Sequence, residues 1–501
     1  MRAFGAPAYE PLDTAVAEVV EDLEEVRWLA ACARERLAAA RRNATARGNA
    51  FRRRTLTTYV AQARSGEAAL ASIEADAADA ARGACGRRGR SRDRLAAERA
   101  ALADLVRMQI AVSAALVAAA DWQSPAFAAT HTPGAGRWHG AISEHENDYK
   151  RDRHDDARFL EDEFAAEFGG APEVRSLLTS CGMSAFTTIL AYLESTARGA
   201  GRVVIGSGLY HECRALLRAS SIEHRIVEVD ENDTAALVGA LEDGGMLFLD
   251  ALCNARSVAI CDLRHILEHA AAHDMSVVVD TTCLSASCRP FLLLPAGARC
   301  RLIVFESLTK YAQFGLDRVT AGLILATRPD AEALDVVREH LGTNITDVSA
   351  CTLPSPNRRR LLRRLKRMER NARIVVRHIN DAVGSPRDRV AGAMHPTLPS
   401  HPSCRVARSL PFAGALITLS FAGRFRGDDF RAVMVERMLE AGRASGSSLC
   451  AGASFGLDVT RIYRTTTGSE ADAFVRIAPG IEDVVVIDGL GRALASACTG
   501  R

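Results

Sequence analysis

Four residues that follow two predicted strands are placed to act together on a small ligand. Asp280 ends one apolar run, and Ser307, Thr309 and Lys310 come directly after another. The carboxyl ends of parallel strands meet at one edge of a sheet, so we expect these side chains to lie close together. Lysine is rare in this chain, with three residues, at 150, 310 and 366, against sixty arginines. A lysine retained after an apolar strand is therefore a candidate for chemistry that needs an amine.

An amine, a carboxylate and hydroxyl groups together match the needs of pyridoxal phosphate. Its aldehyde requires an amine, its pyridinium nitrogen a carboxylate, and its phosphate hydroxyl groups and a helix N-terminus. Residues Ser180–Ser184 supply such a terminus, because they precede an apolar segment predicted to be helical from Phe186 to Leu193. Gly182 in this turn lets backbone N–H groups approach a phosphate closely. The residues therefore predict pyridoxal phosphate as the cofactor.

The elements that must position these residues are predicted from short apolar runs. Six runs rich in β-branched residues alternate with segments long enough for helices, such as 262–273. Strands that are apolar throughout are typical of a mainly parallel sheet with helices on both faces. We therefore expect an α/β fold. The six predicted strands are 202–205, 224–229, 246–249, 276–279, 301–305 and 322–325.

Composition divides the chain into four predicted segments. The first has apolar residues three and four positions apart, which is typical of packed helices, and it carries no group of residues suited to chemistry. We predict that it serves assembly. The segments are 1–121 (helical extension), 122–148 (linker or arm), 149–345 (cofactor-binding domain) and 346–501 (smaller α+β domain).

Charge and cysteine usage limit the classes of protein to which the chain can belong. The formal net charge is +2, which provides no strong field for nucleic acid or for a membrane surface. The start of the chain does not read as a signal peptide, and the apolar stretch at 110–120 is too short to span a bilayer. The thirteen cysteines are scattered singly along the chain. This distribution predicts free thiols in a reducing compartment and no framework of disulfides. We expect a cytoplasmic protein that acts on a small molecule and binds neither nucleic acid nor membranes.

The order of motifs between residues 145 and 495 resembles that of the pyridoxal-phosphate-dependent enzymes of Cys/Met metabolism. This family includes cystathionine γ-synthase, the cystathionine lyases and methionine γ-lyase. The S-S-G-M phosphate turn of the family corresponds to Ser180–Met183, its V-V-D-N-T to Val278–Thr282, and its S-A-T-K-Y to Ser307–Tyr311. The other matches are Y-S-R at Tyr149–Arg151, L-Y at Leu209–Tyr210, the asparagine of T-P-x-N-P at Asn254, V-S-L-G at Ala453–Gly456 and R-L-S-x-G-x-E-D at Arg476–Asp483.

The resemblance implies a role for each matched residue. Lys310 would bind the cofactor covalently and move protons, and Tyr210 would stack on its ring and act as an acid. Arg476 would clamp the substrate carboxylate as a two-pronged donor, with Ser454 also contacting the substrate. Tyr149 and Arg151 would reach the cofactor phosphate of a neighbouring subunit, so that a homodimer is the minimum assembly and a homotetramer the expected one. The remaining residues implied to bind the cofactor are Gly182, Met183, Asn254 (ring oxygen), Asp280 (ring nitrogen), Thr282, Ser307 and Thr309.

The resemblance also implies fold type I, with a mainly parallel seven-stranded sheet, and a reaction that begins at the α-carbon of an amino acid. We expect γ-replacement on an activated homoserine-like substrate, with β- or γ-elimination by a carbon–sulfur lyase as the alternative. Another alternative is a helical assembly protein with a retired cofactor fold. The chain departs from the family around the substrate side-chain pocket. Ala251–Ala255 lacks two prolines, His211–Glu212 replaces the glycine after the tyrosine, and Ala312–Leu316 lacks a histidine.

Overall fold

The computed structural model describes most of the chain as two compact units. The first unit contains residues 1–141 and 482–489, and the second contains residues 142–481 and 490–501. The predicted linker at 122–148 falls outside the described residues, and the boundary predicted at 345 stays a prediction. The described residues are 11–46, parts of 57–75, 88–120, 151–152, 155–196, 201–385, 387–421, 427–465 and 473–499.

Two long helices, α1 (Pro11–Ala46) and α3 (Arg88–Ala120), pack along each other in the first unit. Their apolar residues recur three and four positions apart, which places them on one face of each helix. Val19 and Leu23 of α1 share a buried cluster with Leu95 of α3. The predicted helical character of this region is therefore confirmed.

One stretch of α3, Arg92–Ala118, is long and apolar enough to cross a membrane by length and composition. Its leucines Leu102 and Leu116 are fully buried within the structure. Buried leucines at this spacing are typical of a helix that packs against other helices.

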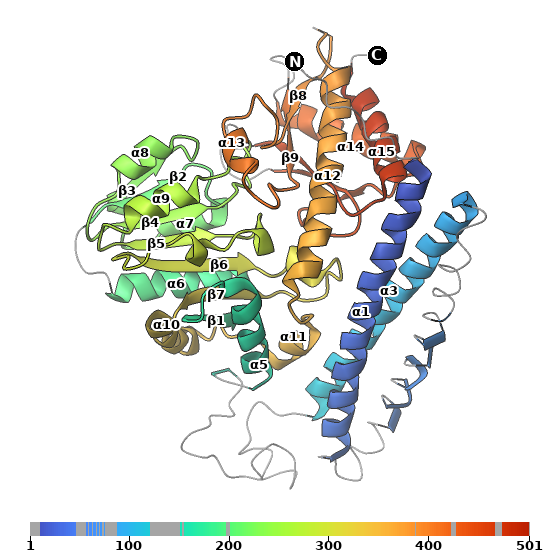
Figure 1. The fold of residues 1–501 in the computed structure, drawn as a ribbon, viewed down its shortest axis with the longest axis horizontal. Helices are drawn as coiled ribbons and strands as arrows, with labels where there is room; N and C mark the ends of the chain where they lie inside the picture. The colour runs from blue at the N-terminus through green and yellow to red at the C-terminus, as the bar shows by residue number, and fades with distance from the viewer. Residues whose placement is uncertain are drawn as a thin grey trace. The chain divides into compact units, whose positions relative to one another are not determined.

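The second unit is built on a seven-stranded sheet in the order β1-β7-β6-β5-β4-β2-β3 (Figure 1). The strands from β3 to β6 pair in parallel, whereas β7 is antiparallel to both β6 and β1. The predicted α/β fold with a mainly parallel sheet is thus confirmed, and β1 is the strand that was not predicted. The strands are β1 (Val174–Thr179), β2 (Val203–Gly206), β3 (Ile226–Val229), β4 (Met246–Asp250), β5 (Ser276–Asp280), β6 (Arg301–Ser307) and β7 (Gly322–Thr327).

Both faces of this sheet are covered, because every residue of β4 is buried although its side chains alternate between the faces. Helices α6, α7 and α10 form one core with the strands. In that core Phe186 of α6 packs against Phe248 and Phe305, with 6.0 and 5.6 Å between ring centroids. The helices of this part are α5 (Asp155–Phe164), α6 (Gly182–Thr196), α7 (His211–Arg218), α8 (Thr234–Gly239), α9 (Leu263–Ala270), α10 (Arg328–Leu341) and α11 (Asp347–Thr352).

A five-stranded sheet in the order β10-β11-β12-β9-β8 follows in the chain. Its strands and helices form the smaller α+β region that the sequence predicts. The strands are β8 (Val390–Met394), β9 (Ile417–Phe421), β10 (Cys450–Ala451), β11 (Arg461–Arg464) and β12 (Val475–Ala478). The helices are α12 (Arg358–Ala382), α13 (Cys404–Ala407) and α14 (Asp428–Ala444), and α15 (Val484–Cys498) has its first residues in the first unit and the rest in the second.

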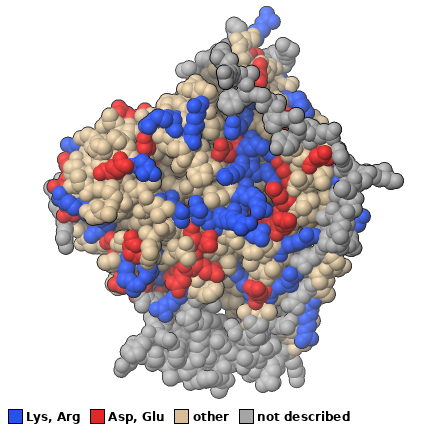
Figure 2. Space-filling model, in the orientation of Figure 1, with Lys and Arg blue, Asp and Glu red and all other residues tan. Residues whose placement is uncertain are grey.

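Helix α12 carries many basic residues, and Figure 2 shows Lys and Arg side chains gathered over it. Its apolar residues face inward, whereas Arg359, Arg363, Lys366, Arg373 and Arg377 are exposed. Acidic residues elsewhere balance this helix, because the net charge of the whole chain is only +2.

Candidate active site

A cavity of about 530 Å³ lies at the carboxyl ends of β2, β4, β5 and β6. This is the edge of the sheet where ligands bind in folds of this class. The cavity brings together residues from both sheets of the second unit. Of the predicted site residues, those that line it are Gly182, Met183, Tyr210, Asn254, Asp280, Thr282, Ser307, Lys310 and Arg476.

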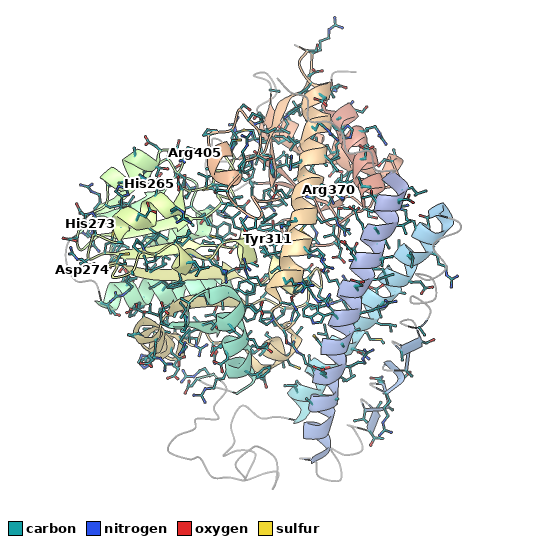
Figure 3. All side chains as sticks on the ribbon, viewed as in Figure 1. His265, His273, Asp274, Tyr311, Arg370 and Arg405 are labelled. Carbon is teal, nitrogen blue, oxygen red and sulfur yellow. The ribbon has the colours of Figure 1, made fainter. Side chains whose placement is uncertain are left out.

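Lys310 reaches this cavity from the segment after β6. Its Nζ donates a hydrogen bond to Ser454 Oγ at 3.2 Å and lies 5.3 Å from the centroid of the Phe455 ring. The neighbouring Tyr311, labelled in Figure 3, packs edge-on against Phe455 with 5.3 Å between ring centroids. Burial lowers the pKa of Lys310, and the positive charge of Arg476 lowers it further. More of this amine is therefore neutral near pH 7 than for a surface lysine, as a nucleophile or base requires.

Two buried carboxyl groups, on neighbouring strands, line the cavity. Asp280 ends β5, and Asp250 ends β4 as its register partner. Asp280 Oδ1 accepts a hydrogen bond from Thr282 N at 2.7 Å, but burial still raises the pKa of Asp280 to about 6. Burial and then the charge of Asp280 raise the pKa of Asp250 well above its ordinary value. A cationic group beside Asp280 would favour its charged form, as the predicted pairing with a pyridinium nitrogen requires.

Asp250 is a site residue that the sequence analysis missed. Its carboxyl group lines the cavity, and the backbone N–H groups of Tyr210 and Asn254 oppose the rise in its pKa. Its Oδ1 is buried and has no hydrogen-bond partner among the described residues. The signal for this residue was available, because Asp250 ends an apolar strand as Asp280 does.

The N-terminus of α6 forms one wall of the cavity, next to the end of β6. A Cβ atom added to Gly182 would lie 2.7 Å from Ser307 Cβ, so only glycine permits this close approach. Thr282 Oγ1 accepts a hydrogen bond from Ser307 N at 2.8 Å, which ties the ends of β5 and β6 together. The first N–H groups of a helix have no partner within the helix and favour an anion. This corner is therefore suited to a phosphate group.

Arg476 of β12 lies in the opposite wall, and its residue is only 3% exposed. Its Nη1 donates a hydrogen bond to Asn254 Oδ1 at 2.8 Å, and its Nη2 donates to Ala453 O. The guanidinium carbon lies 5.2 Å from the centroid of the Phe455 ring and 5.6 Å from that of Tyr463. Its Nε is buried without a hydrogen-bond partner among the described residues. A buried guanidinium with a donor to spare is suited to a carboxylate ligand.

Tyr210 precedes α7 and is half-buried at the cavity. Its ring packs against His211 with 4.7 Å between centroids. Burial raises the pKa of Tyr210, and the negative charge of Glu212 raises it further, whereas Arg476 opposes the shift. Tyr210 is therefore a phenol at neutral pH, the form in which it can donate a proton.

The other predicted site residues do not line the cavity. Thr309 is half-buried outside the lining, and Ser454 reaches the site through Lys310. Arg151 is exposed, and its Nη2 lies 3.0 Å from Asp152 Oδ1. Tyr149 lies outside the described residues. Contacts of these residues with cofactor or substrate stay predictions.

The residues around the cavity fit pyridoxal phosphate. Lys310 supplies a buried amine, Asp280 a carboxylate and the α6 N-terminus an anion site. The unpaired Nε of Arg476 and the unpaired Oδ1 of Asp250 are buried polar atoms of the kind that a bound ligand or solvent satisfies.

Comparison with known proteins agrees with these features. A model of the family described as "Cys/Met metabolism PLP-dependent enzyme" matches residues 111–495. The chain is 26% identical over 349 residues to a curated protein named "Bifunctional enzyme flvA" from Aspergillus flavus. The alignment covers 66% of this chain but only 41% of that protein, so the chain spans about two fifths of the length of this relative.

Three solved structures with a similar fold allow a direct comparison with the chain. A crystal structure of metB from Corynebacterium glutamicum is 21% identical with a TM-score of 0.57, over 70% of this chain and 88% of that one. CalE6, a methionine gamma lyase from Micromonospora echinospora, is 22% identical with a TM-score of 0.57, over 71% and 90%. A cystathionine gamma synthase from Xanthomonas oryzae pv. oryzae, in complex with cystathionine, is 22% identical with a TM-score of 0.57, over 72% and 91%. These likenesses establish the fold.

Proposed function

The chain belongs to the Cys/Met metabolism family of pyridoxal-phosphate-dependent enzymes, and we propose that it catalyses γ-replacement on an activated homoserine-like amino acid. When bound, the cofactor withdraws electrons from the α-carbon of an amino acid and makes the hydrogen there acidic. The protein must then hold the amino acid, take protons from carbon, and give a proton to the leaving group.

In this proposal the cofactor is held by residues from three strand ends and one helix. Lys310 would hold the aldehyde group of the cofactor through its amine, and the Asp280 carboxylate would pair with the ring nitrogen. The N-terminus of α6 and the hydroxyl groups of Ser307 and Thr282 hold the phosphate. All of these residues line the same cavity.

One observation carries the assignment to an amino-acid substrate. The guanidinium of Arg476, with its Nε unpaired, and the Lys310 amine open into the same cavity. Arg476 is placed to hold the α-carboxylate, while the lowered pKa of Lys310 allows the amine to take the α-proton. A ligand oriented by both groups exposes its α-carbon to the base.

In this proposal two residues, Lys310 and Tyr210, carry out the remaining proton transfers. Lys310 moves a proton at the β-carbon, and the Tyr210 hydroxyl donates its proton to the leaving group at the γ-carbon. The incoming nucleophile then takes the place of the leaving group at the γ-carbon and gives its proton to the Tyr210 oxygen, which restores the phenol. The cavity of about 530 Å³ is within the range of about 300–1,000 Å³ common for small-molecule sites.

The proposal is tested by supplying activated homoserine esters with and without a thiol nucleophile. We expect the thiol to be joined to the amino acid, and little 2-oxo acid to form while it is present. Release of 2-oxo acid at the same rate with and without the nucleophile would instead assign the protein as an eliminating lyase. A purified protein that binds no added pyridoxal phosphate would point to a retired cofactor fold.

We also propose that the enzyme is at least a homodimer, and that two dimers form a tetramer. Arg151 is exposed, pairs with Asp152 and does not line the cavity of its own chain, and the family resemblance implies a contact with the cofactor of a neighbouring subunit. Replacing it with alanine should weaken cofactor binding, whereas the same change at the exposed Arg158 of α5 should not. Sedimentation of the holoenzyme as a monomer, or an unchanged cofactor affinity in R151A, would contradict this proposal.

A further inference from the structure

The segment that carries Lys310 is a long connection between two neighbouring strands. β6 and β7 pair antiparallel, and a hydrogen bond from Leu308 N to Ala321 O, at 2.9 Å, closes the base of the connection. Neighbouring antiparallel strands are commonly joined by about two to five residues. Residues 308–321, which we call the lysine loop, therefore need interactions of their own to keep one shape.

The side-chain amide of Gln313 lies inside the lysine loop and is only 1% exposed. Its Nε2 donates hydrogen bonds to Leu308 O at 3.3 Å and to Val319 O at 2.7 Å. Its Oε1 accepts hydrogen bonds from Arg318 N at 2.9 Å and from Val319 N at 3.0 Å. These bonds use both donors and both acceptor sites of an amide, so Gln313 joins the start of the loop to its end with no polar group left over.

The partners of Gln313 also define which way its amide points. A reversed amide would place its NH₂ group against two backbone N–H groups and its oxygen against two carbonyl oxygens, so the assignment is unambiguous. Buried backbone groups that lose their partners are costly. A side chain without both a donor and an acceptor at this position would therefore leave the two ends of the lysine loop unpaired.

The backbone is held on either side of Lys310. Leu308, two residues before the lysine, is tied through its carbonyl oxygen to Gln313. Tyr311, directly after the lysine, is buried, and its ring packs edge-on against two phenylalanine rings with 5.8 and 5.3 Å between centroids. These two neighbours set the direction in which the Lys310 side chain leaves the backbone.

The turn after Gln313 has an unfavourable backbone conformation. Phe314 is buried with a φ of +51°, in the left-handed region that residues other than glycine rarely adopt. The family pattern has glycine where this chain has Phe314, and it leaves the position of Gln313 open. A strained residue persists where the surrounding interactions fix it, and the hydrogen bonds of Gln313 supply such interactions here.

Gln313 does not line the cavity, so any effect on the reaction must pass through the lysine loop. We propose that Gln313 is a positioning residue that holds this loop in the shape that directs the Lys310 amine to the substrate α-carbon. This inference rests on the proposed function, in which that amine takes the α-proton. Proton transfer needs its two heavy atoms about 2.6–3.2 Å apart, and a misplacement of about 1 Å can lower a rate about 100-fold.

The first test uses the cofactor-free protein. Q313M replaces the amide with an apolar side chain of similar length. We expect the backbone N–H groups of Arg318 and Val319 to exchange with solvent deuterium about tenfold faster in Q313M, because they lose their acceptor. Hydrogen exchange followed by mass spectrometry measures this rate. Unchanged exchange at both residues overturns the proposal.

The matched control is N380L, which removes another amide that is bonded to the backbone. Asn380 Nδ2 donates to Ala393 O at 3.0 Å, and its Oδ1 accepts from Ala393 N at 2.7 Å, away from the cavity lining. N380L should destabilise the protein in a similar way but leave exchange at Arg318 and Val319 unmoved. It therefore separates the specific effect of Gln313 from a general loss of stability.

The second test follows Lys310 in the holoenzyme. Exchange of the substrate α-hydrogen with solvent deuterium reports the proton transfer, and its dependence on amino-acid concentration reports binding. Q313M should slow exchange at saturation by about 10–100-fold and change the half-saturating concentration less than about threefold, because Arg476 holds the carboxylate. N380L should alter neither quantity. A full rate in Q313M, or a loss confined to binding, overturns the positioning role.

Q313E is a milder variant that remains informative where Q313M does not fold. It keeps an acceptor oxygen for Arg318 and Val319 but removes the donor to Leu308, so both measurements should fall between those of Q313M and the unaltered protein. If no amino acid shows α-exchange with the unaltered enzyme, the proposed function fails, whatever the backbone exchange shows. If α-exchange occurs and neither variant slows it, only the role of Gln313 fails.

Discussion

Replacing Gly182 with alanine places a methyl group where the N-terminus of α6 meets the end of β6. The added Cβ would lie 2.7 Å from Ser307 Cβ, 3.1 Å from Ser307 Cα and 3.2 Å from Ser307 Oγ. Ordinary contacts of a Cβ begin at 3.4 Å, so the helix and the strand must separate by about 0.7 Å. Overpacking of this kind costs about 1–3 kcal/mol. We expect G182A to lower the free energy of unfolding of the cofactor-free protein by this amount.

The same displacement should weaken cofactor binding. A hydrogen bond to a charged group contributes about 1.5–3 kcal/mol, so loss of one N–H contact with the phosphate raises the dissociation constant about 10–100-fold. Urea unfolding measures the first effect, and titration with pyridoxal phosphate followed by absorbance measures the second.

The matched control is G239A. A Cβ added to Gly239, at the end of α8, meets nothing within 4 Å. Alanine should therefore leave stability unchanged or raise it by up to about 1 kcal/mol. If G182A unfolds at the same urea concentration as the unaltered protein and binds the cofactor equally well, the close approach of α6 to β6 is wrong.

Three further predictions concern buried ionisable groups. D250N should leave the free energy of unfolding in urea unchanged or raise it, because burial and the charge of Asp280 disfavour the charged form of Asp250, and a loss of more than about 1 kcal/mol would refute this reasoning. Burial lowers the pKa of His395 from 6.5 to about 4, so stability should fall by about 3 kcal/mol as the pH drops between these values. H395Q should reduce that loss, and an identical acid dependence in the variant would refute the assignment. Capture of pyridoxal phosphate by the cofactor-free protein should slow as acid protonates Lys310, and stopped-flow absorbance showing no pH dependence would contradict its lowered pKa.

The sequence predicted six strands of the seven-stranded sheet from their apolar runs and missed β1. β1 contains Arg175 and Ser176, so it lacks the continuous apolar run used to recognise the others. Ser176 is polar and yet buried. Its Oγ donates a hydrogen bond to the backbone oxygen of Glu161 in α5, with 2.5 Å between the two atoms, so burial does not leave the hydroxyl unpaired. Val174 pairs with Thr327, far along the chain. Such long-range pairing leaves no local pattern in the sequence.

The candidate site also combines residues that the sequence predicted with contacts that only the structure shows. Gly182, Asp280 and Lys310 lie next to strand ends or a helix start, so their grouping at one edge of the sheet followed from the predicted fold. The hydrogen bond from Arg476 to Asn254 joins residues 222 positions apart and is visible only in the structure. It occupies an oxygen of Asn254, the residue expected to contact the cofactor ring.

The bond between the cofactor aldehyde and one lysine is the central claim, and borohydride reduction tests it directly. The holoenzyme is reduced, digested with trypsin and mapped by mass spectrometry. We predict a pyridoxyl label on Lys310 in a peptide spanning 302–318, because the modified lysine resists cleavage. The exposed Lys366 on α12 should remain unlabelled. A label at Lys150 or Lys366 in its place, or no label at all, would contradict the account.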